Sequence, residues 1–361
     1  MKNRIRRART GHKALVFTAV ATTAVLLAGC QSGAAGGTPD AGQKETGEGL
    51  VIGWSQRGIS GSDWWKTLVE GGQAEAEAIG ARIELLDANG DTVRQNADVQ
   101  TLITKGVDVV IMNPNDPIGV APSVQALADA GIPLVTVNSN LDESLIPDMF
   151  CYVAEDQEYT GSLAGEVAAN KAIEKFGDSG EMKIVGIGGF PGDVLTDLRF
   201  DGFMEGWESV MAEHPGVESV KLETKYGEWK PDKALAPIRD VATANPDLKI
   251  VYSMSDVMNG GVVSGLQQAG LWGDGVILSS YDGGMVSVKE MIDNPTGPLQ
   301  ATASNQPWDQ GATAVKMALA AYNDEQSACP DQTLFIDTTV VTPENAADYY
   351  VADDTYVRAR D

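Results

Sequence analysis

The stretch LVIGWSQRGISGSDWWKTLVEGGQAEAEAIGARIELLDANGD, residues 50–91, decides the fold. It starts with a short apolar run at 50–55, continues through a polar loop into a helical segment, and ends in a second apolar run at 82–88. A strand, a helix and a strand in this order are the unit of a parallel sheet, because the helix returns the chain to the end from which the first strand began.

The same alternation continues along the chain. Further apolar runs rich in β-branched residues lie at 107–113, 132–138, 149–155, 183–189, 220–226, 248–254, 276–282 and 299–305. Helical patterns lie between them at 91–106, 119–131, 160–177, 232–246 and 260–270. Near-continuous apolar strands indicate sheets that helices cover on both faces. Ten strands fit two sheets better than one, so the sequence predicts an α/β fold with two doubly wound, Rossmann-like parallel-sheet domains.

The first 29 residues have the composition of an export signal. A basic segment, MKNRIRRARTGHK, is followed by sixteen small and apolar residues, which is somewhat short for a membrane span. The segment ends in LAGC at 27–30, which resembles the bacterial lipobox, in which the cysteine (here Cys30) is lipidated and becomes the new N-terminus. An uncleaved anchor helix is the alternative. In both cases the Gly-rich residues 31–48 are a flexible tether, and the rest of the chain lies outside the cytoplasmic membrane.

Composition excludes several classes of function. The net charge of −25 argues against nucleic acid and anionic membrane surfaces as partners. Histidine and cysteine are scarce, which argues against a zinc site, a Ser-His-Asp triad and a Cys-His pair, and we expect no metal and no cofactor. Besides Cys30 the cysteines are Cys151 and Cys329. In an oxidising compartment such a pair forms a disulfide if the two meet, which the sequence leaves open.

Ligands of parallel α/β sheets bind beyond the carboxyl ends of the strands. The residues at these positions are aromatic rings, neutral amides, hydroxyls, a few carboxylates and one arginine. Rings cover the C–H faces of a sugar, and the polar groups bond its hydroxyls. A phosphate ligand would need a Gly-rich cradle or clustered bases, which the chain lacks. An amino acid would need a carboxylate clamp, and Arg199 leaves that alternative open.

Two adjacent tryptophans, Trp64 and Trp65, stand at the start of the first helix. Neighbouring helical residues point about 100° apart, so one can enter the core while the other faces a ligand. The alternative is that both are core aromatics.

Several segments occur in a characteristic order and spacing along the chain: 50–91, NADVQTLITKGVDVVIMNPNDP, GIPLVTVNS, RFDGFMEGW, YSMSDVMNGGVVSGLQQAG, SSYDGG and ASNQPWDQGATAV. Through these segments the chain, over about residues 49–345, resembles the ribose/galactose-type branch of the type I periplasmic binding proteins. The resemblance implies two domains joined by three crossovers, near Glu155, Gln306 and Asp337. It also implies closure of a hinge over a ligand and delivery of that ligand to an ABC permease with its ATPase.

The resemblance also implies a ligand site. Its candidate residues are Ser62, Trp64, Trp65, Asn138, Ser139, Asp193, Arg199, Trp229, Ser255, Asp256, Asp282 and Gln306. Asn138 and Ser139 replace the Asp-Arg pair that is frequent in the family after the fourth strand. The loss of these two hydroxyl-binding groups argues against ribose itself, but not against a sugar or polyol.

The expected domains are a signal peptide at 1–29, the lipidated cysteine and tether at 30–48, an N-terminal lobe of 49–155 plus 307–337, and a C-terminal lobe of 156–306 plus 338–361. The expected function is a monomeric, lipid-anchored solute-binding protein of an ABC importer, without enzymatic activity. A subunit that presents its ligand to a membrane sensor is the main alternative. A glycoside hydrolase would need an acid and a nucleophile, which the fold does not single out among the many carboxylates. A cytoplasmic sugar-responsive repressor conflicts with the export signal.

Overall fold

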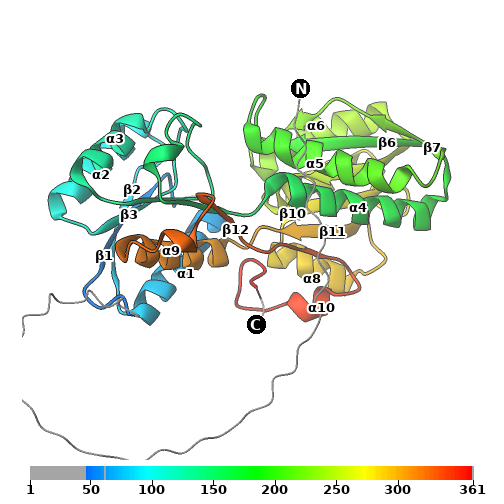
Figure 1. Cartoon of the computed structure of the whole chain (residues 1–361). Helices are drawn as coiled ribbons and strands as arrows, with labels where there is room; N and C mark the ends of the chain where they lie inside the picture. Colours follow the sequence, from blue (N-terminus) through cyan, green and yellow to red (C-terminus); the bar gives the residue numbers. More distant parts are fainter. Residues whose placement is uncertain (1–45, 61, 360–361) are drawn as a thin grey trace, which may run out of the picture. The chain divides into compact units, whose positions relative to one another are not determined.

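The computed structural model describes residues 46–60 and 62–359. The predicted export signal, Cys30 and most of the tether lie outside this part of the chain. The described residues form two β-sheets, each with helices on both faces (Figure 1). The prediction of two parallel-sheet α/β domains is confirmed.

The first sheet has the strand order β12-β5-β4-β3-β1-β2, and all its neighbours are parallel. Its strands are β1 (Val51–Gln56), β2 (Arg82–Asp87), β3 (Val109–Met112), β4 (Leu134–Val137), β5 (Cys151–Ala154) and β12 (Thr333–Phe335). Helices α2 (Thr92–Lys105) and α3 (Ala121–Ala130) cover one face, and α1 (Asp63–Ile79) and α9 (Pro307–Tyr322) cover the other (Figure 1). Val109 and Ile111 point to the second face while Val110 and Met112 point to the first, as the two-residue period of a strand requires.

The second sheet has the order β13-β11-β10-β9-β6-β7, with β8 paired to β6. Its strands are β6 (Ser179–Gly188), β7 (Gly216–Lys221), β8 (Lys225–Tyr226), β9 (Leu248–Ser253), β10 (Ile277–Asp282), β11 (Leu299–Ser304) and β13 (Thr339–Val341). The edge strand β13 is antiparallel to β11, and the other pairs are parallel. The single strand predicted at 220–226 is two short strands in the structure, β7 and β8.

Within residues 46–60 and 62–359, five longer helices cover the second sheet. They are α4 (Gln157–Phe176), α5 (Val194–Met211), α6 (Pro231–Ala244), α7 (Asn259–Gln268) and α8 (Met285–Asp293), and a short helix, α10 (Ala346–Tyr349), lies against α8. Helices α4 and α5 share one apolar cluster with the sheet, and α6, α7 and α8 share another. Among the described residues, no helix is both long enough and apolar enough to cross a membrane.

Three connections carry the chain between the two sheets. Residues 155–156 lead from β5 to α4, which packs on β10 and β11. Residues 305–306 lead from β11 back to α9, which packs on β3 and β4. Residues 336–338 lead from β12 to β13. The strands β12 and β13 were not predicted, because three residues are too few to show a period.

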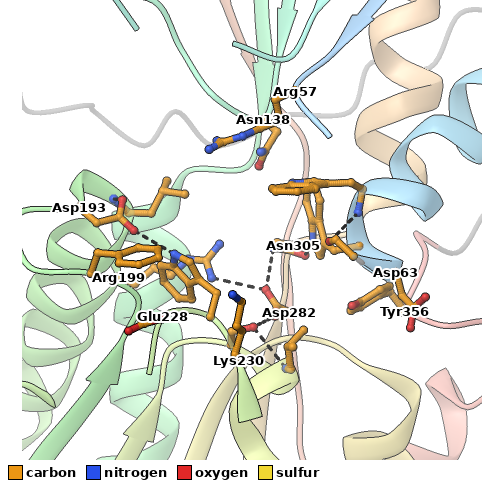
Figure 2. Close-up of a pocket in the computed structure, with 18 residues that line it drawn as sticks. Arg57, Asp63, Asn138, Asp193, Arg199, Glu228, Lys230, Asp282, Asn305 and Tyr356 are labelled. Atoms are coloured by element: carbon orange, nitrogen blue, oxygen red, sulfur yellow. Dashed lines mark hydrogen bonds and ion pairs between the residues drawn. The ribbon is translucent and has the colours of Figure 1, made fainter. Parts of the chain in front are cut away.

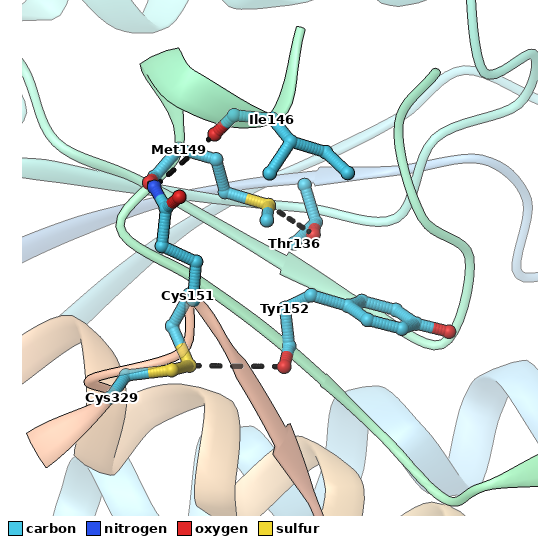
Figure 3. The surroundings of a disulfide bond; sticks show 7 residues. Thr136, Ile146, Met149, Cys151, Tyr152 and Cys329 are labelled. Carbon is cyan, nitrogen blue, oxygen red and sulfur yellow. Dashed lines mark hydrogen bonds between the residues drawn. A yellow bond between two sulfur atoms is a disulfide. The ribbon is translucent and has the colours of Figure 1, made fainter. Parts of the chain in front are cut away.

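A disulfide joins Cys151 in β5 to Cys329, with an S–S distance of 2.03 Å and a Cα–Cα distance of 5.9 Å (Figure 3). Both cysteines are buried in the apolar cluster between the first sheet and helices α1 and α9. The bond ties the segment after α9 to the strand from which the first connection leaves.

Glycines allow α4 and α5 to cross with their backbones in contact. A Cβ atom on Gly165 of α4 would lie 2.0 Å from the carbonyl oxygen of Phe203, and one on Gly206 of α5 would lie 1.9 Å from that of Ser162. Glycine is therefore required at this crossing. The crossing fixes α5 relative to α4, and α5 carries Arg199.

Candidate functional site

A cavity of about 520 Å³ lies where the carboxyl ends of strands from both sheets meet (Figure 2). It is lined by Arg57, Ser62, Asp63, Trp64, Trp65, Asn138, Phe190, Asp193, Leu195, Arg199, Glu228, Trp229, Lys230, Ser255, Val257, Asp282, Asn305 and Tyr356. Its volume lies in the range of small-molecule sites, and its lining combines rings with a few convergent polar groups.

Both tryptophans of the first helix reach the cavity. Ser62 caps α1 by accepting a hydrogen bond from the Trp65 backbone N–H at 3.3 Å. Trp64 is 8% exposed, belongs to the core of the first domain, and donates from Nε1 to Asn305 Oδ1 at 2.8 Å. Trp65 is less buried, and its ring lies 5.3 Å from the Arg57 guanidinium. One indole is thus mainly structural and the other mainly faces the cavity, although both line it.

Arg57 comes from the loop after β1, and its Nη1 donates to Ser139 Oγ at 3.2 Å. Its Nε is buried without a hydrogen-bond partner in the described part of the chain. Burial lowers the pKa of the guanidinium, and the nearby Asp193 raises it. Arg57 thus places a guanidinium close to positions 138–139, where the sequence lacks the arginine expected from the resemblance.

The opposite wall is built around Arg199 of α5, which is 5% exposed. Its Nε donates to Gln157 Oε1 at 2.7 Å and its Nη1 to the Met254 carbonyl oxygen at 2.6 Å. The guanidinium lies 3.9 Å from the ring centroid of Tyr281 and 5.6 Å from that of Trp229. These contacts hold the side chain in one orientation at the cavity wall.

Trp229 follows β8 in the left-handed backbone region, with a φ of 56°. Its Nε1 donates to Asp193 Oδ2 at 3.1 Å, and Asp193 caps α5. A Cβ atom on Gly189 would lie 2.0 Å from the indole, so the ring occupies space that only a glycine leaves free.

Asp282, at the end of β10, is 3% exposed and has a φ of 108°. Its carboxylate accepts hydrogen bonds from Ser255 Oγ at 2.5 Å and from Asn305 Nδ2 at 3.0 Å, and it pairs with Arg199 at 3.5 Å. Burial raises the pKa of Asp282 to about 7, and the Arg199 charge opposes this shift.

Nine of the twelve residues that the sequence proposed line the cavity, and Ser139, Asp256 and Gln306 do not. Ser139 instead orients Arg57. Asp256 accepts hydrogen bonds from the hydroxyls of Ser280, Ser287 and Thr302 and from the Gly284 N–H, and therefore organises the loops behind the cavity. Gln306 is the residue before α9 and has a φ of 46°, in the left-handed region. Its neighbour Asn305 reaches the cavity in its place.

Sequence reasoning missed nine residues that line the cavity. They are Arg57, Asp63, Phe190, Leu195, Glu228, Lys230, Val257, Asn305 and Tyr356. Most of them lie in the loops that follow predicted strands, within a few residues of a residue that the sequence proposed. Only the direction of their side chains could not be predicted. Tyr356 is different, because it lies in no such loop.

A buried polar network lies beside the cavity at the connections between the sheets. Glu155, which is 1% exposed, accepts hydrogen bonds from Gln310 Nε2 at 2.6 Å and from Tyr281 Oη at 3.2 Å, and one from Gln157. Burial raises the pKa of Glu155 to about 7, and the Arg199 charge and the hydrogen bonds from Tyr281 and Gln310 oppose the shift. The network links the first two connections to the residues that hold Arg199.

Two parallel-sheet domains, three connections between them and a cavity lined from both are the features of a two-domain solute-binding protein. A family model described as "Periplasmic binding protein domain" matches residues 52–326. The chain belongs to this family, and its fold is that of the type I periplasmic binding proteins.

Among curated proteins, the ribose import binding protein of Salmonella typhimurium is 28% identical over 252 residues, which cover 70% of this chain and 78% of that protein. Among solved structures, an ABC transporter solute-binding protein of Mycobacterium smegmatis with bound glycerol is 31% identical, with a TM-score of 0.72, over 86% of this chain and 99% of that one. A solute-binding protein of Agrobacterium vitis bound to α-D-tagatopyranose is 28% identical, with a TM-score of 0.65, over 86% and 100%. The homologues are thus sugar- and polyol-binding proteins of ABC transporters. They are extracytoplasmic transport proteins, not enzymes.

Proposed function

We propose that this protein captures a sugar or polyol between its two domains and delivers it to an ABC importer. The observation that carries the proposal is the cavity, whose walls place Trp65 on one domain and Trp229 on the other, with hydrogen-bonding groups between them. Indole faces cover the C–H surfaces of a sugar, and amides, carboxylates and guanidinium groups bond its hydroxyls.

The charges of the lining favour an uncharged ligand. Basic residues at the wall, such as Arg57 and Lys230, are offset by acidic ones, such as Asp63 and Glu228. Arg199, the candidate clamp for an amino-acid carboxylate, already donates to Gln157 and Met254 and pairs with Asp282. A ligand carboxylate at Arg199 would lie close to the Asp282 carboxylate, which already pairs with this guanidinium at 3.5 Å, so we infer that an amino acid is not the ligand.

The ligand closes the two domains by contacting both. We assign residues 49–155 and 307–337 to the N-terminal lobe, and 156–306 and 338–361 to the C-terminal lobe. All twelve residues proposed from the sequence remain part of this hypothesis, the nine at the cavity wall as ligand contacts and the other three as their supports. A ligand that touches both lobes binds the closed form better, and this difference in affinity drives closure.

The transport role includes features outside the described residues. We infer that the chain is exported, cleaved before Cys30 and anchored by a lipid on that cysteine, and that it acts as a monomer with a permease and its ATPase. We infer no enzymatic activity, since the members of the family are transport binding proteins.

Titration of the purified protein tests the proposal. D-ribose, D-tagatose, xylitol, myo-inositol and a set of amino acids are screened by thermal shift, and hits are measured by calorimetry. A ligand at one hundred times its Kd stabilises the folded state by about 2.7 kcal/mol. We expect at least one sugar or polyol to raise the melting temperature and small-angle scattering to show compaction with it. Binding of amino acids alone, or no compaction, would contradict the proposal.

A further inference from the structure

Residues 355–359, here called the 355–359 arm, touch both domains. The backbone of the arm bonds to the second domain, where the Val357 N–H donates to the Gly283 carbonyl at 2.8 Å and the Met285 N–H donates to that of Thr355 at 2.9 Å. Tyr356 also forms an antiparallel bridge with Gly284. The arm is thereby an extended strand beside the loop that follows Asp282.

Consecutive side chains of the arm enter different cores. Val357 is fully buried in the cluster of the second domain, with residues of α6, α7 and α8. Tyr356 is 5% exposed and belongs to the cluster of the first domain, with residues of α1 and α9. Extended backbone points successive side chains to opposite sides, so this short segment can hold two domains at once.

The end of the arm is fastened to the first domain. The Arg358 guanidinium lies 3.6 Å from the ring centroid of Trp308, at the start of α9, and also pairs with Asp354. The Ala359 N–H donates to Asp309 Oδ2 at 2.9 Å. These contacts add to the three covalent connections a fourth link that is not covalent.

The arm also contributes to the cavity. Tyr356 lines it beside Asp63, across from Arg199 and Asp193 (Figure 2). Within the described part of the chain the Tyr356 hydroxyl has no hydrogen-bond partner, and it is not among the fully buried unpaired polar atoms. The hydroxyl is therefore available to hydrogen-bond a molecule in the cavity. Burial raises the pKa of this tyrosine, so the phenol stays neutral and can both donate and accept.

We propose that Tyr356 is a ligand-contacting, specificity-determining residue, and that the 355–359 arm holds it in place by bridging the two domains. The ligand group that it meets is a hydroxyl of the sugar or polyol, so this inference rests on the proposed function. The ring limits the cavity on the side of Asp63, and the hydroxyl bonds whichever ligand oxygen reaches that side.

Two variants of Tyr356 test the contact. Calorimetry with whichever of D-ribose, D-tagatose, xylitol and myo-inositol binds the unmodified full chain gives the reference Kd. Tyr356→Phe keeps the ring in the core and removes only the hydroxyl, and we expect the Kd to rise about three- to tenfold, as for one lost neutral hydrogen bond. Tyr356→Ala removes the ring as well, and we expect a larger loss. The control is Tyr159→Phe, a change in an exposed tyrosine of α4 outside the cavity lining, which should leave the Kd unchanged.

Hydrogen exchange of the ligand-free chain tests the arm separately. Arg358→Ala removes the contact with Trp308, and we expect the amides of Met285 and Val357 to exchange at least tenfold faster while the amides of β9 keep their rates. Unchanged exchange would show that the arm does not depend on its contacts with the first domain and would overturn the bridge.

Kd values of both Tyr356 variants within twofold of the unmodified protein would overturn the ligand contact. A rise in Tyr356→Ala alone would support the ring contact and overturn the role of the hydroxyl. If none of the probes binds the unmodified chain, the proposed function fails and the ligand contact with it, whereas the exchange experiment still decides whether the arm bridges the domains.

Discussion

Helices α4 and α5 cross with their backbones in contact, and α5 carries Arg199 of the cavity wall. The substitution Gly165→Ala tests how strongly the second domain and the cavity depend on this crossing. A Cβ atom at this position would lie 2.0 Å from the Phe203 carbonyl oxygen, whereas ordinary van der Waals contact begins at 3.4 Å, so the helices must separate by about 1.4 Å. Overpacking of this kind costs about 1–3 kcal/mol, and backbone atoms cannot relax as a side chain would. Alanine also stabilises the helix by about 1 kcal/mol relative to glycine, because its helix propensity is higher. Because both clashing groups are backbone or fixed to it, we take the upper end of the overpacking range, about 3 kcal/mol, and expect a net loss of about 2 kcal/mol in the free energy of unfolding.

The same change should weaken binding. Arg199 lies on α5, and its hydrogen bonds of 2.7 Å to Gln157 and 2.6 Å to Met254 tolerate shifts of only a few tenths of an ångström. A helix displacement larger than that would misplace the guanidinium, and we expect at least a tenfold rise in Kd for the sugar or polyol that the unmodified protein binds.

Gly260→Ala is a matched control for this prediction. Gly260 lies in helix α7, and the nearest atom to an added Cβ is 4.0 Å away. Here alanine meets no obstacle and should stabilise the protein by about 0.5–1 kcal/mol. Guanidinium unfolding curves of both variants give the comparison. Equal stabilities, or a Gly165→Ala protein that is as stable as the unmodified one, would refute the argument from backbone contact.

Three further predictions concern the disulfide, the buried network and the cavity. The double substitution Cys151→Ala and Cys329→Ala removes a cross-link over 178 residues. Chain entropy predicts that the free energy of unfolding falls by about 5 kcal/mol, and native disulfides of other proteins contribute about 2–5 kcal/mol. Guanidinium unfolding curves measure the loss. Because burial raises the pKa of Glu155 from 4.5 to about 7, its stabilising protonated form is lost as the pH rises through this range. Glu155→Gln should therefore gain stability relative to the unmodified protein from pH 5 to pH 7, by up to about 1.4 kcal/mol per pH unit, in urea unfolding at each pH. Trp229→Ala and Asp282→Ala should each raise the Kd by at least tenfold, or about 1.4 kcal/mol, in calorimetry.

Each of these predictions has a contrary result. Equal unfolding midpoints of the unmodified and Cys-free proteins under oxidising conditions would mean that the disulfide adds no stability. Parallel pH curves for Glu155→Gln and the unmodified protein would show that Glu155 does not titrate in this range. For the cavity, Trp272→Ala is the control, since Trp272 packs on the second-domain core outside the cavity lining. If Trp229→Ala and Asp282→Ala bind the ligand as tightly as this control and the unmodified protein do, the ligand site lies elsewhere.

Much of the site was predictable because parallel strands bring their carboxyl ends to one edge. Residues at or shortly after the ends of predicted strands, such as Trp229, Ser255 and Asp282, line the cavity for this reason. The side-chain direction within a loop was not predictable. The Asp256 carboxylate points toward the hydroxyls of Ser287 and Thr302. Asn305 rather than Gln306 reaches the cavity. Local backbone angles and neighbouring loops decide in each case which of two adjacent residues faces the cavity.

The sequence by itself determined the alternation of strands and helices, and through it the parallel sheets, since local periodicity and glycine stops act within a few turns of chain. Tertiary structure alone decided the contacts between distant segments. The pairing of Cys151 with Cys329, the approach of Arg57 to Ser139 and the return of Tyr356 to the cavity each join residues far apart in sequence. No local pattern encodes such contacts, because they depend on the packing of both domains at once.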